Sequence, residues 1–393
     1  MKSVPRFNFK NPQVENPTRK LIVVMVLLLA FGLLMIYDAT SIYSQSIYGN
    51  SYQFVLLQLA WIVIGLLGFS FFYFFDYRKI RTFAYIVFIV SLFGLGVLAI
   101  AGLFPCGSSI PFAPCINGAN RWLFINPDPL PKIPFLGVLG FQPGELAKLG
   151  LVLYLAVQIA LKAKKEDGFW VYLIISGLFS SLVFLQPNMS TAMMLFLIGS
   201  MIYFCTGFSV KGFFILGPLL LVFVGLMIFI SPYRRERLLT FTGRSSDSTR
   251  ELSEDYHVKQ ISIALGSGGF SGVGFGQSRQ KYQYLPEVAT DSIFAIIGEE
   301  TGFVGTTAVL VAFAYFLYIG LTIAQNAPDL LGRLLAVGVI SWMGLQFFIN
   351  ASAMVRLIPL TGVPMPLISY GGSSMVFSLM GLGILANVGR RFN

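Results

Sequence analysis

Long apolar runs, separated by short polar links, dominate this sequence. There are about ten of them, and most approach the length of about 20 residues that a helix needs to cross the hydrocarbon core of a bilayer. Hydrophobic residues make up 56% of the 393 residues, and charged residues only 11%. A water-soluble domain of this size has too little interior to bury so much apolar surface. The chain is therefore predicted to be an all-α polytopic membrane protein. The predicted spans are Leu21–Tyr37, Phe54–Phe75, Phe83–Leu103, Leu146–Leu161, Phe169–Leu185, Met189–Phe204, Phe213–Ile230, Ile293–Ala324, Leu331–Ile349 and Met375–Val388.

The charges in the links predict the orientation. Residues 1–20 are rich in Lys and Arg, the link DYRKIR is basic, and Arg390 and Arg391 end the chain. Basic links stay on the cytoplasmic side, so a cytoplasmic tail (1–20) and two cytoplasmic termini are expected in a multi-pass protein of the cell inner membrane. Residues 21–393 then form one membrane domain. Its long external loops are 104–144 and, between spans 7 and 8, 231–290. The net charge of +10 is attributed to orientation and lipid contact, so no nucleic-acid partner is expected.

The stretch LPEVATDSIFAIIGEETG holds four carboxylates at the start of the eighth apolar run. A helix that begins at Pro286 would place Glu287 and Asp291 on one face, with Asp291 at the boundary between water and hydrocarbon. Acids at such depth are usually functional, although they can also solvate a helix end. The eighth run is too long for one straight span, so its first part, with Glu299 and Glu300, is predicted to be a separate helix at the interface.

Further polar clusters lie in the segments predicted to be external. Arg121 follows Asn120 in GANRWLF, and Glu145 and Lys148 begin the fourth span one turn apart, where they either pair or bind substrate. Arg234 and Arg235 suit a phosphate or diphosphate, or else anionic lipid headgroups. Gln260 precedes a Gly-rich turn. Because these clusters lie in the external segments, the active surface is expected to face outward.

Cysteine and histidine usage limits the chemistry. Cys106 and Cys115 lie in an external loop, where they either form a disulfide or remain unrelated thiols. The single histidine, His257, is the one possible base of a catalytic triad, but the sequence has no nucleophile elbow to accompany it. The sequence does not support a zinc site built from His and Cys, and it has no Walker A motif for ATP. An acid beside arginines and lipid-facing spans suits an amphiphile with a diphosphate head. A carboxylate there could deprotonate a sugar hydroxyl as general base, and the lipid diphosphate would be the leaving group.

The motifs LPEVATDSIFAIIGEETG, GANRW, FQPGELAKL, LQPNMST, YRRERLLTF and PLTGVPMPLISYGGSS together resemble the SEDS family, the FtsW/RodA peptidoglycan glycosyltransferases. The resemblance runs from the first span to the last and is closer to the cell-division branch than to the elongation branch. It implies a lipid II polymerase with ten spans, which acts in septal cell-wall synthesis. Its expected partners are a class B penicillin-binding protein with transpeptidase activity and other divisome proteins. No cofactor is evidently required, and a divalent cation (Mg or Mn) is possible.

The resemblance also assigns roles to residues. The acid of the LPE…TD segment maps onto Asp291, the expected general base. Glu287, Arg121, Glu145, Lys148 and Gln260 fall at cavity positions and are expected to bind substrate, as are Arg234 and Arg235. The chain departs from the family pattern at Asn188, where an acid usually follows LQP, and at Ser292, where Phe is usual.

Two other functions fit the same residues. A lipid II flippase or other lipid transporter would use the same cavity from both sides, but it should show charged or broken helices near the midplane and a cytoplasmic opening. The short cytoplasmic links argue against that function. A non-catalytic scaffold of the division machinery would recruit a transpeptidase and would not need an acid at position 291.

Overall fold

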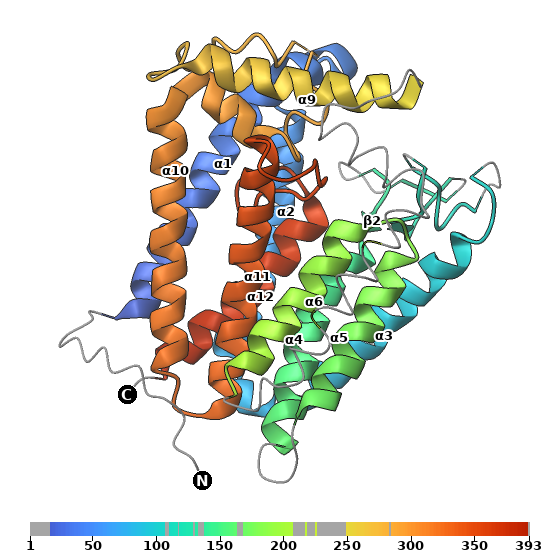
Figure 1. Ribbon diagram of the computed structural model, residues 1–393, viewed down its shortest axis with the longest axis vertical. Coiled ribbons are helices and arrows are strands. Elements are labelled where there is room, and N and C mark those ends of the chain that lie inside the picture. The colour runs from blue at the N-terminus through green and yellow to red at the C-terminus, as the bar shows by residue number, and fades with distance from the viewer. Residues whose placement is uncertain are drawn as a thin grey trace.

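The computed structural model is a bundle of long, roughly aligned helices with one helix across its end (Figure 1). It describes the chain from residue 16 to residue 391, apart from 107–109, 117, 129, 133–136, 163–167, 207–216, 218–224, 226–248 and 283. The helices are α1 (Pro17–Tyr48), α2 (Gln53–Phe74), α3 (Arg81–Ala101), α4 (Pro143–Lys162), α5 (Phe169–Phe184), α6 (Met189–Phe204), α9 (Thr249–Gly268), α10 (Ile293–Gln325), α11 (Leu330–Met354) and α12 (Gly372–Arg390). A short 3-10 helix, η1 (Tyr77–Lys79), and a hairpin of β1 (Leu123–Phe124) and β2 (Gly140–Phe141) complete the elements.

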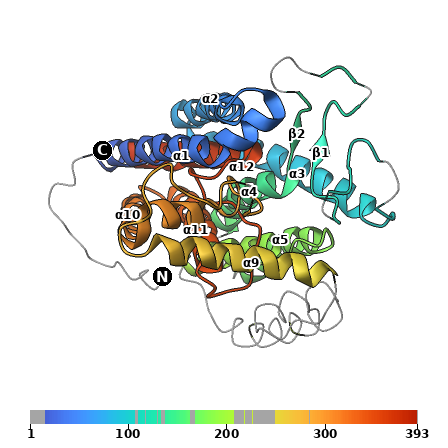
Figure 2. The same ribbon diagram turned by 90° about the horizontal axis from the view of Figure 1, so that it is seen from above.

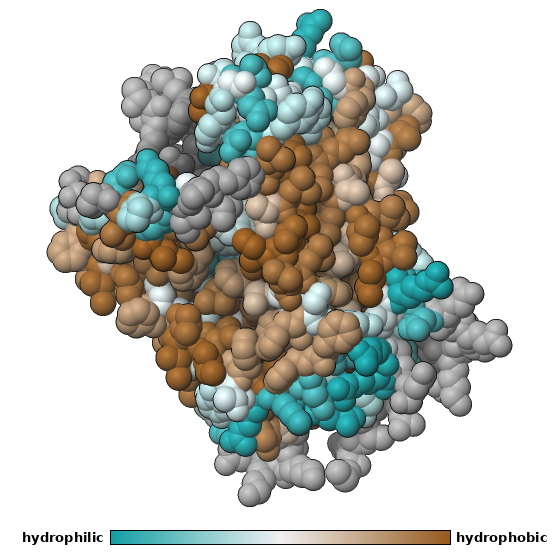
Figure 3. Space-filling view, turned by 180° about the vertical axis from the view of Figure 1, so that it is seen from behind, coloured by the Kyte–Doolittle hydropathy of each residue, from teal (hydrophilic) through white to brown (hydrophobic). Residues whose placement is uncertain are grey.

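Apolar side chains cover the sides of the bundle. Among the described residues, seven helices are long and apolar enough to cross a membrane, and the apolar helices α5 and α6 are shorter. Only 22% of the most apolar stretch of α2 is buried, against 72% of the corresponding stretches of α4 and α12. From behind, a broad apolar band lies between polar ends (Figure 3). The chain is therefore a multi-pass membrane protein whose peripheral helices face lipid and whose central helices form the core.

The centre of the bundle is formed by α4, α11 and α12. Helix α12 packs most extensively against α2, and small residues allow this approach. A Cβ atom at Gly383 would fall within 2.9 Å of the Cα of Phe69, and one at Gly381 would lie 3.1 Å from the Trp342 ring. These two glycines allow the close packing of α12 against its neighbours. Gly96 on α3 differs, because nothing lies within 4 Å of its Cβ position.

The predicted spans agree with the observed helices, except that Phe213–Ile230 lies outside the described residues. The largest difference is at the first span, predicted to end at Tyr37. Helix α1 continues to Tyr48, because Asp38 and Ser44 are buried against the rest of the fold instead of solvating a helix end. The start of α1 and the end of α12 lie at one end of the bundle, and α9 and the start of α10 lie at the other (Figure 1).

The loop predicted between spans 7 and 8 contains a helix. Helix α9 crosses the end of the bundle and packs against the start of α10 (Figure 2). The helix predicted to begin at Pro286 is wrong, since α10 begins at Ile293. Residues 285–292 form turns instead, and Glu287 has a positive φ of 49° that no α-helix contains. Glu287 and Asp291 therefore do not share a helical face.

Helix α10 is broken where the sequence predicts that its long apolar run cannot stay straight. Gly302 has φ 66° and ψ −161°, which lies outside the helical region. Ahead of this break, Glu299 and Glu300 are buried, at 2% and 1% exposure, because both side chains have partners in the loop that follows α9. The placement of this first part of α10 at the membrane interface stays a prediction.

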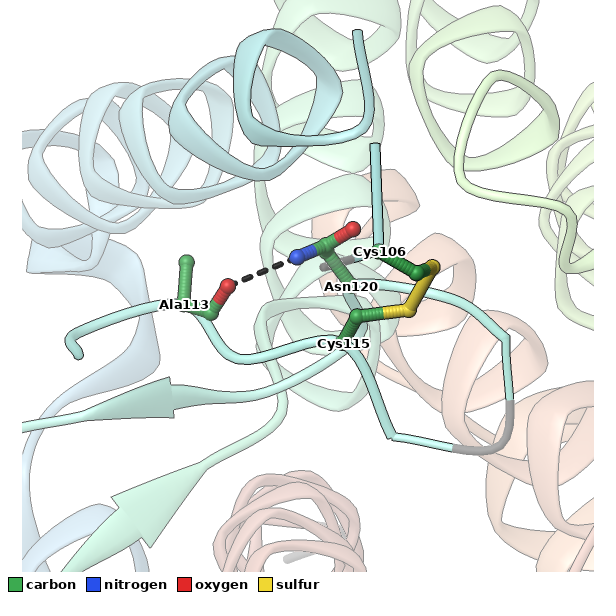
Figure 4. Close-up of a disulfide and its surroundings, with 4 residues drawn as sticks. All are labelled: Cys106, Ala113, Cys115 and Asn120. Atoms are coloured by element: carbon green, nitrogen blue, oxygen red, sulfur yellow. Dashed lines mark hydrogen bonds between the residues drawn. A yellow bond between two sulfur atoms is a disulfide. The ribbon is translucent and has the colours of Figure 1, made fainter. Parts of the chain in front are cut away.

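The segment between α3 and α4 is held by its own covalent and polar contacts. Cys106 and Cys115 form a disulfide, the first of the two alternatives left open by the sequence. Close to it, the amide of Asn120 donates a 2.7 Å hydrogen bond to the carbonyl of Ala113 (Figure 4). The third cysteine, Cys205, is free and exposed at the end of α6.

Candidate functional site

The carboxylate loop, residues 285–292, is the last part of the segment that joins α9 to α10. Its backbone turns on itself, because the amides of Thr290 and Ser292 both donate to the carbonyl of Glu287 at 3.2 Å. The Thr290 hydroxyl donates to the Glu287 carboxylate at 2.9 Å. The Ser292 hydroxyl donates to the Pro286 carbonyl at 3.1 Å and lies 2.9 Å from Nε2 of His257. The loop is therefore held to α9 through the only histidine of the chain.

Helix α11 fixes the position of Asp291. The Asn350 amide, which is 1% exposed, donates to the carbonyl of Asp291 at 2.7 Å and to that of Val363 at 2.8 Å. A Cβ atom at Gly362 would lie 3.3 Å from Oδ2 of Asp291, so the backbone of the α11–α12 loop passes beside this carboxylate. The Tyr370 amide also donates to the Ala289 carbonyl at 2.8 Å. Asp291 itself is half-buried.

A second polar group lies inside the bundle at the start of α4. Nζ of Lys148 is 2.6 Å from Oε1 of Glu145 and donates to Oε1 of Gln346 at 2.8 Å. Both charged side chains are almost fully buried, with 0% and 5% exposure. The indole of Trp342 donates to the same Gln346 oxygen, and Lys148 lies 5.4 Å from its ring centroid. Oε2 of Glu145 is buried without a hydrogen-bond partner among the described residues, which leaves this oxygen able to accept from a ligand or water.

One face of α11 connects the two groups. Gln346 and Asn350 are four positions apart and therefore lie one above the other on the helix. The Gln346 amide donates to the Pro364 carbonyl at 2.9 Å, next to the Val363 carbonyl that accepts from Asn350. The structure therefore brings the Lys148–Glu145 pair and the carboxylate loop to the same side of α11. Sequence reasoning missed both amides, although polar amides near the end of an apolar run are themselves a signal.

The other predicted site residues have different surroundings. Arg121 is half-buried, and its guanidinium donates to the Pro187 carbonyl at 2.7 Å, so it connects the segment between α3 and α4 to the α5–α6 turn. Gln260 is half-buried on α9, and Glu287 is exposed. Arg234 and Arg235 lie outside the described residues. The cavity that the sequence predicts beside Asp291 stays a prediction.

A buried ion cluster, formed by Lys281, Asp38 and Glu300, was not predicted. Nζ of Lys281 lies 2.8 Å from Oδ1 of Asp38 and 3.3 Å from Oε1 of Glu300, and it donates to the Gly276 carbonyl at 2.8 Å. Burial lowers the pKa of the Lys281 ammonium. Its hydrogen bonds and the charges of the two acids outweigh that effect, so the pKa is raised above its ordinary value.

The loop that contains Lys281, residues 276–281, is also bound to Glu299. The Arg279 amide donates to Oε1 of Glu299 at 3.0 Å, and the Ser278 hydroxyl donates to Oε2. Together with the ion cluster, these bonds attach residues 276–281 to the first part of α10. The sequence offered only two signals of this ion cluster, a lysine in a loop and an acid at the end of an apolar run. It could not show that they pair, because 243 positions separate Asp38 from Lys281.

The side chains that could bind a metal ion are not clustered in the described part of the chain. Among the residues that the structure describes, no three His, Cys, Asp or Glu side chains come together in a way that could hold a metal ion. The divalent cation that the sequence leaves open therefore stays a prediction.

Comparisons with known proteins agree over almost the whole chain. Residues 18–393 match the model of the FtsW/RodA/SpoVE family, described as cell cycle protein. The chain is 33% identical to stage V sporulation protein E of Bacillus subtilis (strain 168), over 95% of this chain and 97% of that protein. It is 35% identical to the probable peptidoglycan glycosyltransferase FtsW of the same organism, over 94% and 89% of the two chains. With the FtsW of Geobacter sp. (strain M18) the identity is 31%, over 96% and 98%.

Solved structures share the fold. A chain from a peptidoglycan synthase complex, solved to describe how polymerization and crosslinking are coordinated, aligns with a TM-score of 0.72 at 24% identity, over 95% of this chain and 98% of that one. The rod shape determining protein RodA of Thermus thermophilus aligns with a TM-score of 0.65 at 23% identity, over 94% and 96%. These likenesses confirm the all-α polytopic fold.

Proposed function

Because the chain belongs to the FtsW/RodA/SpoVE family of cell cycle proteins, we propose that it is a peptidoglycan glycosyltransferase that polymerises lipid II on the outer face of the cytoplasmic membrane. Membership confirms the family resemblance seen in the motifs. The glycosyltransferase activity rests on relatives that are themselves named as peptidoglycan glycosyltransferases. We assign the chain to septal synthesis on the closer resemblance of its motifs to the cell-division branch.

The proposed reaction is a direct displacement. Asp291 accepts the proton of the acceptor GlcNAc 4-hydroxyl, and the oxygen forms a bond to C1 of the donor MurNAc. The bond between C1 and the diphosphate oxygen breaks, so undecaprenyl diphosphate leaves with the electron pair and C1 inverts. Glu287, Arg121, Glu145, Lys148 and Gln260, with Arg234 and Arg235, are proposed to bind the two lipid-linked substrates. A divalent cation, Mg²⁺ or Mn²⁺, stays a prediction and is included as a variable of the test.

The observation that supports this proposal best is the way the carboxylate loop is held. Asn350 and Tyr370 bind main-chain carbonyls of the loop, and His257 contacts Ser292. These ties do not use the Asp291 carboxylate, so exchanging that carboxylate for an amide leaves them in place. A general base requires this arrangement, because the reacting group must be positioned by its surroundings while it remains half-exposed to substrate.

Orientation and partners are part of the proposal. The start of α1 and the end of α12 lie at one end of the bundle, and α10, which follows the carboxylate loop, starts at the other (Figure 1). Basic residues flank the start of α1 and the end of α12, and by the positive-inside rule they support termini in the cytoplasm and Asp291 outside. We propose a class B penicillin-binding protein and other divisome proteins as partners. Support comes from the shared fold with a chain of a peptidoglycan synthase complex.

The test is a lipid II polymerisation assay on purified full-length protein in detergent, with glycan strands resolved on gels. Asp291→Asn is expected to remain folded and to lose polymerisation by at least about 100-fold, the usual contribution of a general base. Asp128→Asn, an exposed acid in the external segment, is the matched control and should polymerise normally. Each protein is assayed with Mg²⁺, with Mn²⁺ and with chelator.

The same assay separates the alternatives. Wild-type rates from Asp291→Asn would contradict the base assignment. If the folded wild type forms no strands by itself or with its transpeptidase partner, the scaffold function is favoured. Movement of labelled lipid II between leaflets of vesicles, with no polymer formed, would instead indicate a transporter.

A further inference from the structure

A cavity of about 470 Å³ opens between α1 and α10, away from the carboxylate loop. It is located near the first residues of α1, at the end of the bundle where α1 begins and α12 ends (Figure 1). It does not include any residue of the candidate site. Its lining combines two cations, one amide, two valines and an aromatic ring: Arg19, Lys20, Asn16, Val23, Val24 and Tyr315.

The positions of the lining residues on α1 follow helical geometry. Asn16 and Lys20, Arg19 and Val23, and Lys20 and Val24 are each four positions apart, so they form adjacent rows along the first two turns. Cations therefore lie at the end of the helix and valines one turn further in. This order is that of a lipid molecule, in which a charged head precedes an apolar chain.

The start of α1 is electrostatically suited to an anion. Arg19 and Lys20 occupy its first turn, which contains no acidic residue, and the Asn16 side chain makes no capping hydrogen bond. The N-terminal end of a helix has a partial positive charge, which adds to the potential of the two cations. This positive potential attracts an anionic group such as a phosphate.

The surface that surrounds the cavity faces lipid. Helices α1 and α10 are both long and apolar enough to span the membrane. Val23 is 50% exposed and Tyr315 is 45% exposed, and they belong to the apolar surface that the bundle presents to the bilayer. A hollow in such a surface cannot stay empty in a membrane, and lipid is the molecule in contact with it. Tyrosine at this depth is typical of the membrane interface.

From the cavity and its charges we infer that α1 and α10 form a binding site for one anionic phospholipid, with its phosphate at Arg19 and Lys20 and an acyl chain along Val23, Val24 and Tyr315. Basic pockets between spanning helices on the cytoplasmic side bind such headgroups in other proteins. If the termini are cytoplasmic, the lipid comes from the inner leaflet. The inference does not depend on the glycosyltransferase activity, because no residue of the proposed reaction lines the cavity.

Native mass spectrometry of the full-length chain in detergent tests this site. Phosphatidylglycerol or cardiolipin is titrated into delipidated protein, and phosphatidylcholine serves as the zwitterionic reference. Wild type should retain one anionic lipid in preference to phosphatidylcholine. Arg19→Gln/Lys20→Gln should weaken that binding by roughly 10-fold, from the attraction that two basic residues near a membrane surface supply.

Lys79→Gln/Arg81→Gln is the matched control. It removes two exposed cations from the link between α2 and α3, which do not line the cavity. It should bind the anionic lipid as wild type does. Tyr315→Ala tests the apolar part and should weaken anionic and zwitterionic lipids alike. Equal retention of anionic lipid by wild type and Arg19→Gln/Lys20→Gln would overturn the inference, as would equal affinity of wild type for both lipid classes.

Discussion

The side-chain amide of Asn350 donates a 2.7 Å hydrogen bond to the backbone carbonyl of Asp291, although 59 positions separate the two residues. A second bond from the same amide reaches the Val363 carbonyl at 2.8 Å. One nitrogen of α11 therefore joins the carboxylate loop to the loop before α12. If Asp291 is the general base, the position of its carboxylate depends on an amide that does not touch substrate.

Asn350→Ala is expected to reduce kcat for lipid II polymerisation by about 10- to 100-fold, because small displacements of a reacting group have effects of that size. It should also destabilise the fold, since two buried carbonyls lose their donor at about 1–3 kcal/mol each. The KM for lipid II should change less than kcat. Polymerisation kinetics and thermal unfolding of the purified variant measure both effects.

Asn387→Ala provides the control for Asn350→Ala. Asn387 is 2% exposed and donates to the Phe72 and Tyr73 carbonyls at 2.8 and 2.9 Å, so its removal leaves the same kind of unpaired group. It belongs to the last turns of α12, far along the chain from the carboxylate loop. Asn387→Ala should destabilise the protein and leave kcat of the folded fraction unchanged. Equal losses of kcat in the two variants would show that the effect of Asn350→Ala is only general destabilisation.

Lys281→Met is expected to lower the free energy of unfolding by about 3–5 kcal/mol, because it leaves Asp38 and Glu300 buried without their cation. Lys132→Met is the control, since its 3.7 Å pair with Asp128 is exposed and is worth at most about 1 kcal/mol. Thermal unfolding in detergent measures the difference. If the two variants melt together, the ion cluster does not stabilise the loop.

The raised pKa of Lys281 determines how this stabilisation depends on pH. A lysine whose folded pKa exceeds the unfolded value of about 10.4 contributes its full stabilisation below that value and loses it as pH rises through the folded pKa. The stability that wild type has over Lys281→Met should therefore not shrink between neutral and mildly alkaline pH, and the part supplied by this lysine should be lost only in strong alkali. A decrease between neutral and mildly alkaline pH would contradict the direction of the shift.

The spans were predictable because the length of an apolar run depends only on local composition. The turns of residues 285–292, ahead of α10, were not predictable in the same way, because Pro286 and the acids that follow imitate the first turn of a helix. Contacts from Asn350 and Tyr370 hold these residues in turns instead. Partners remote in sequence thus overrode a local signal.

Local sequence signals predicted only part of the candidate site. Asp291, Glu145 and Lys148 stand out as charges at the edges of apolar runs, and the structure places the last two in direct contact. Gln346 and Asn350 carry no charge, and only the folded chain shows that they connect these groups. Whether the predicted residues bind and convert substrate is left to the assay of Asp291→Asn.

Gly302→Ala is expected to destabilise the protein by more than the roughly 1–3 kcal/mol of backbone strain alone, because φ 66° and ψ −161° belong to a region almost restricted to glycine. A Cβ atom there would also lie 2.3 Å from the Gly272 nitrogen. Gly96→Ala, at a helical position with nothing within 4 Å, should stabilise by up to about 1 kcal/mol. Thermal unfolding compares the two alanines, and a harmless Gly302→Ala would show that the break in α10 does not need this glycine.

The Cys106–Cys115 disulfide provides a test of orientation as well as of structure. Protein purified from cells and alkylated under denaturing conditions should be labelled only at Cys205 without reductant, and at all three cysteines after reduction. Disulfides persist in oxidising compartments, so this result would place the segment between α3 and α4 outside the cytoplasm and the termini inside. Cys106→Ser/Cys115→Ser should lower the free energy of unfolding by about 2–3 kcal/mol, because the open loop gains conformational freedom in the unfolded chain. Labelling of all three cysteines before reduction would mean that the bond does not form in the cell, and the external placement of this segment would lose its covalent support.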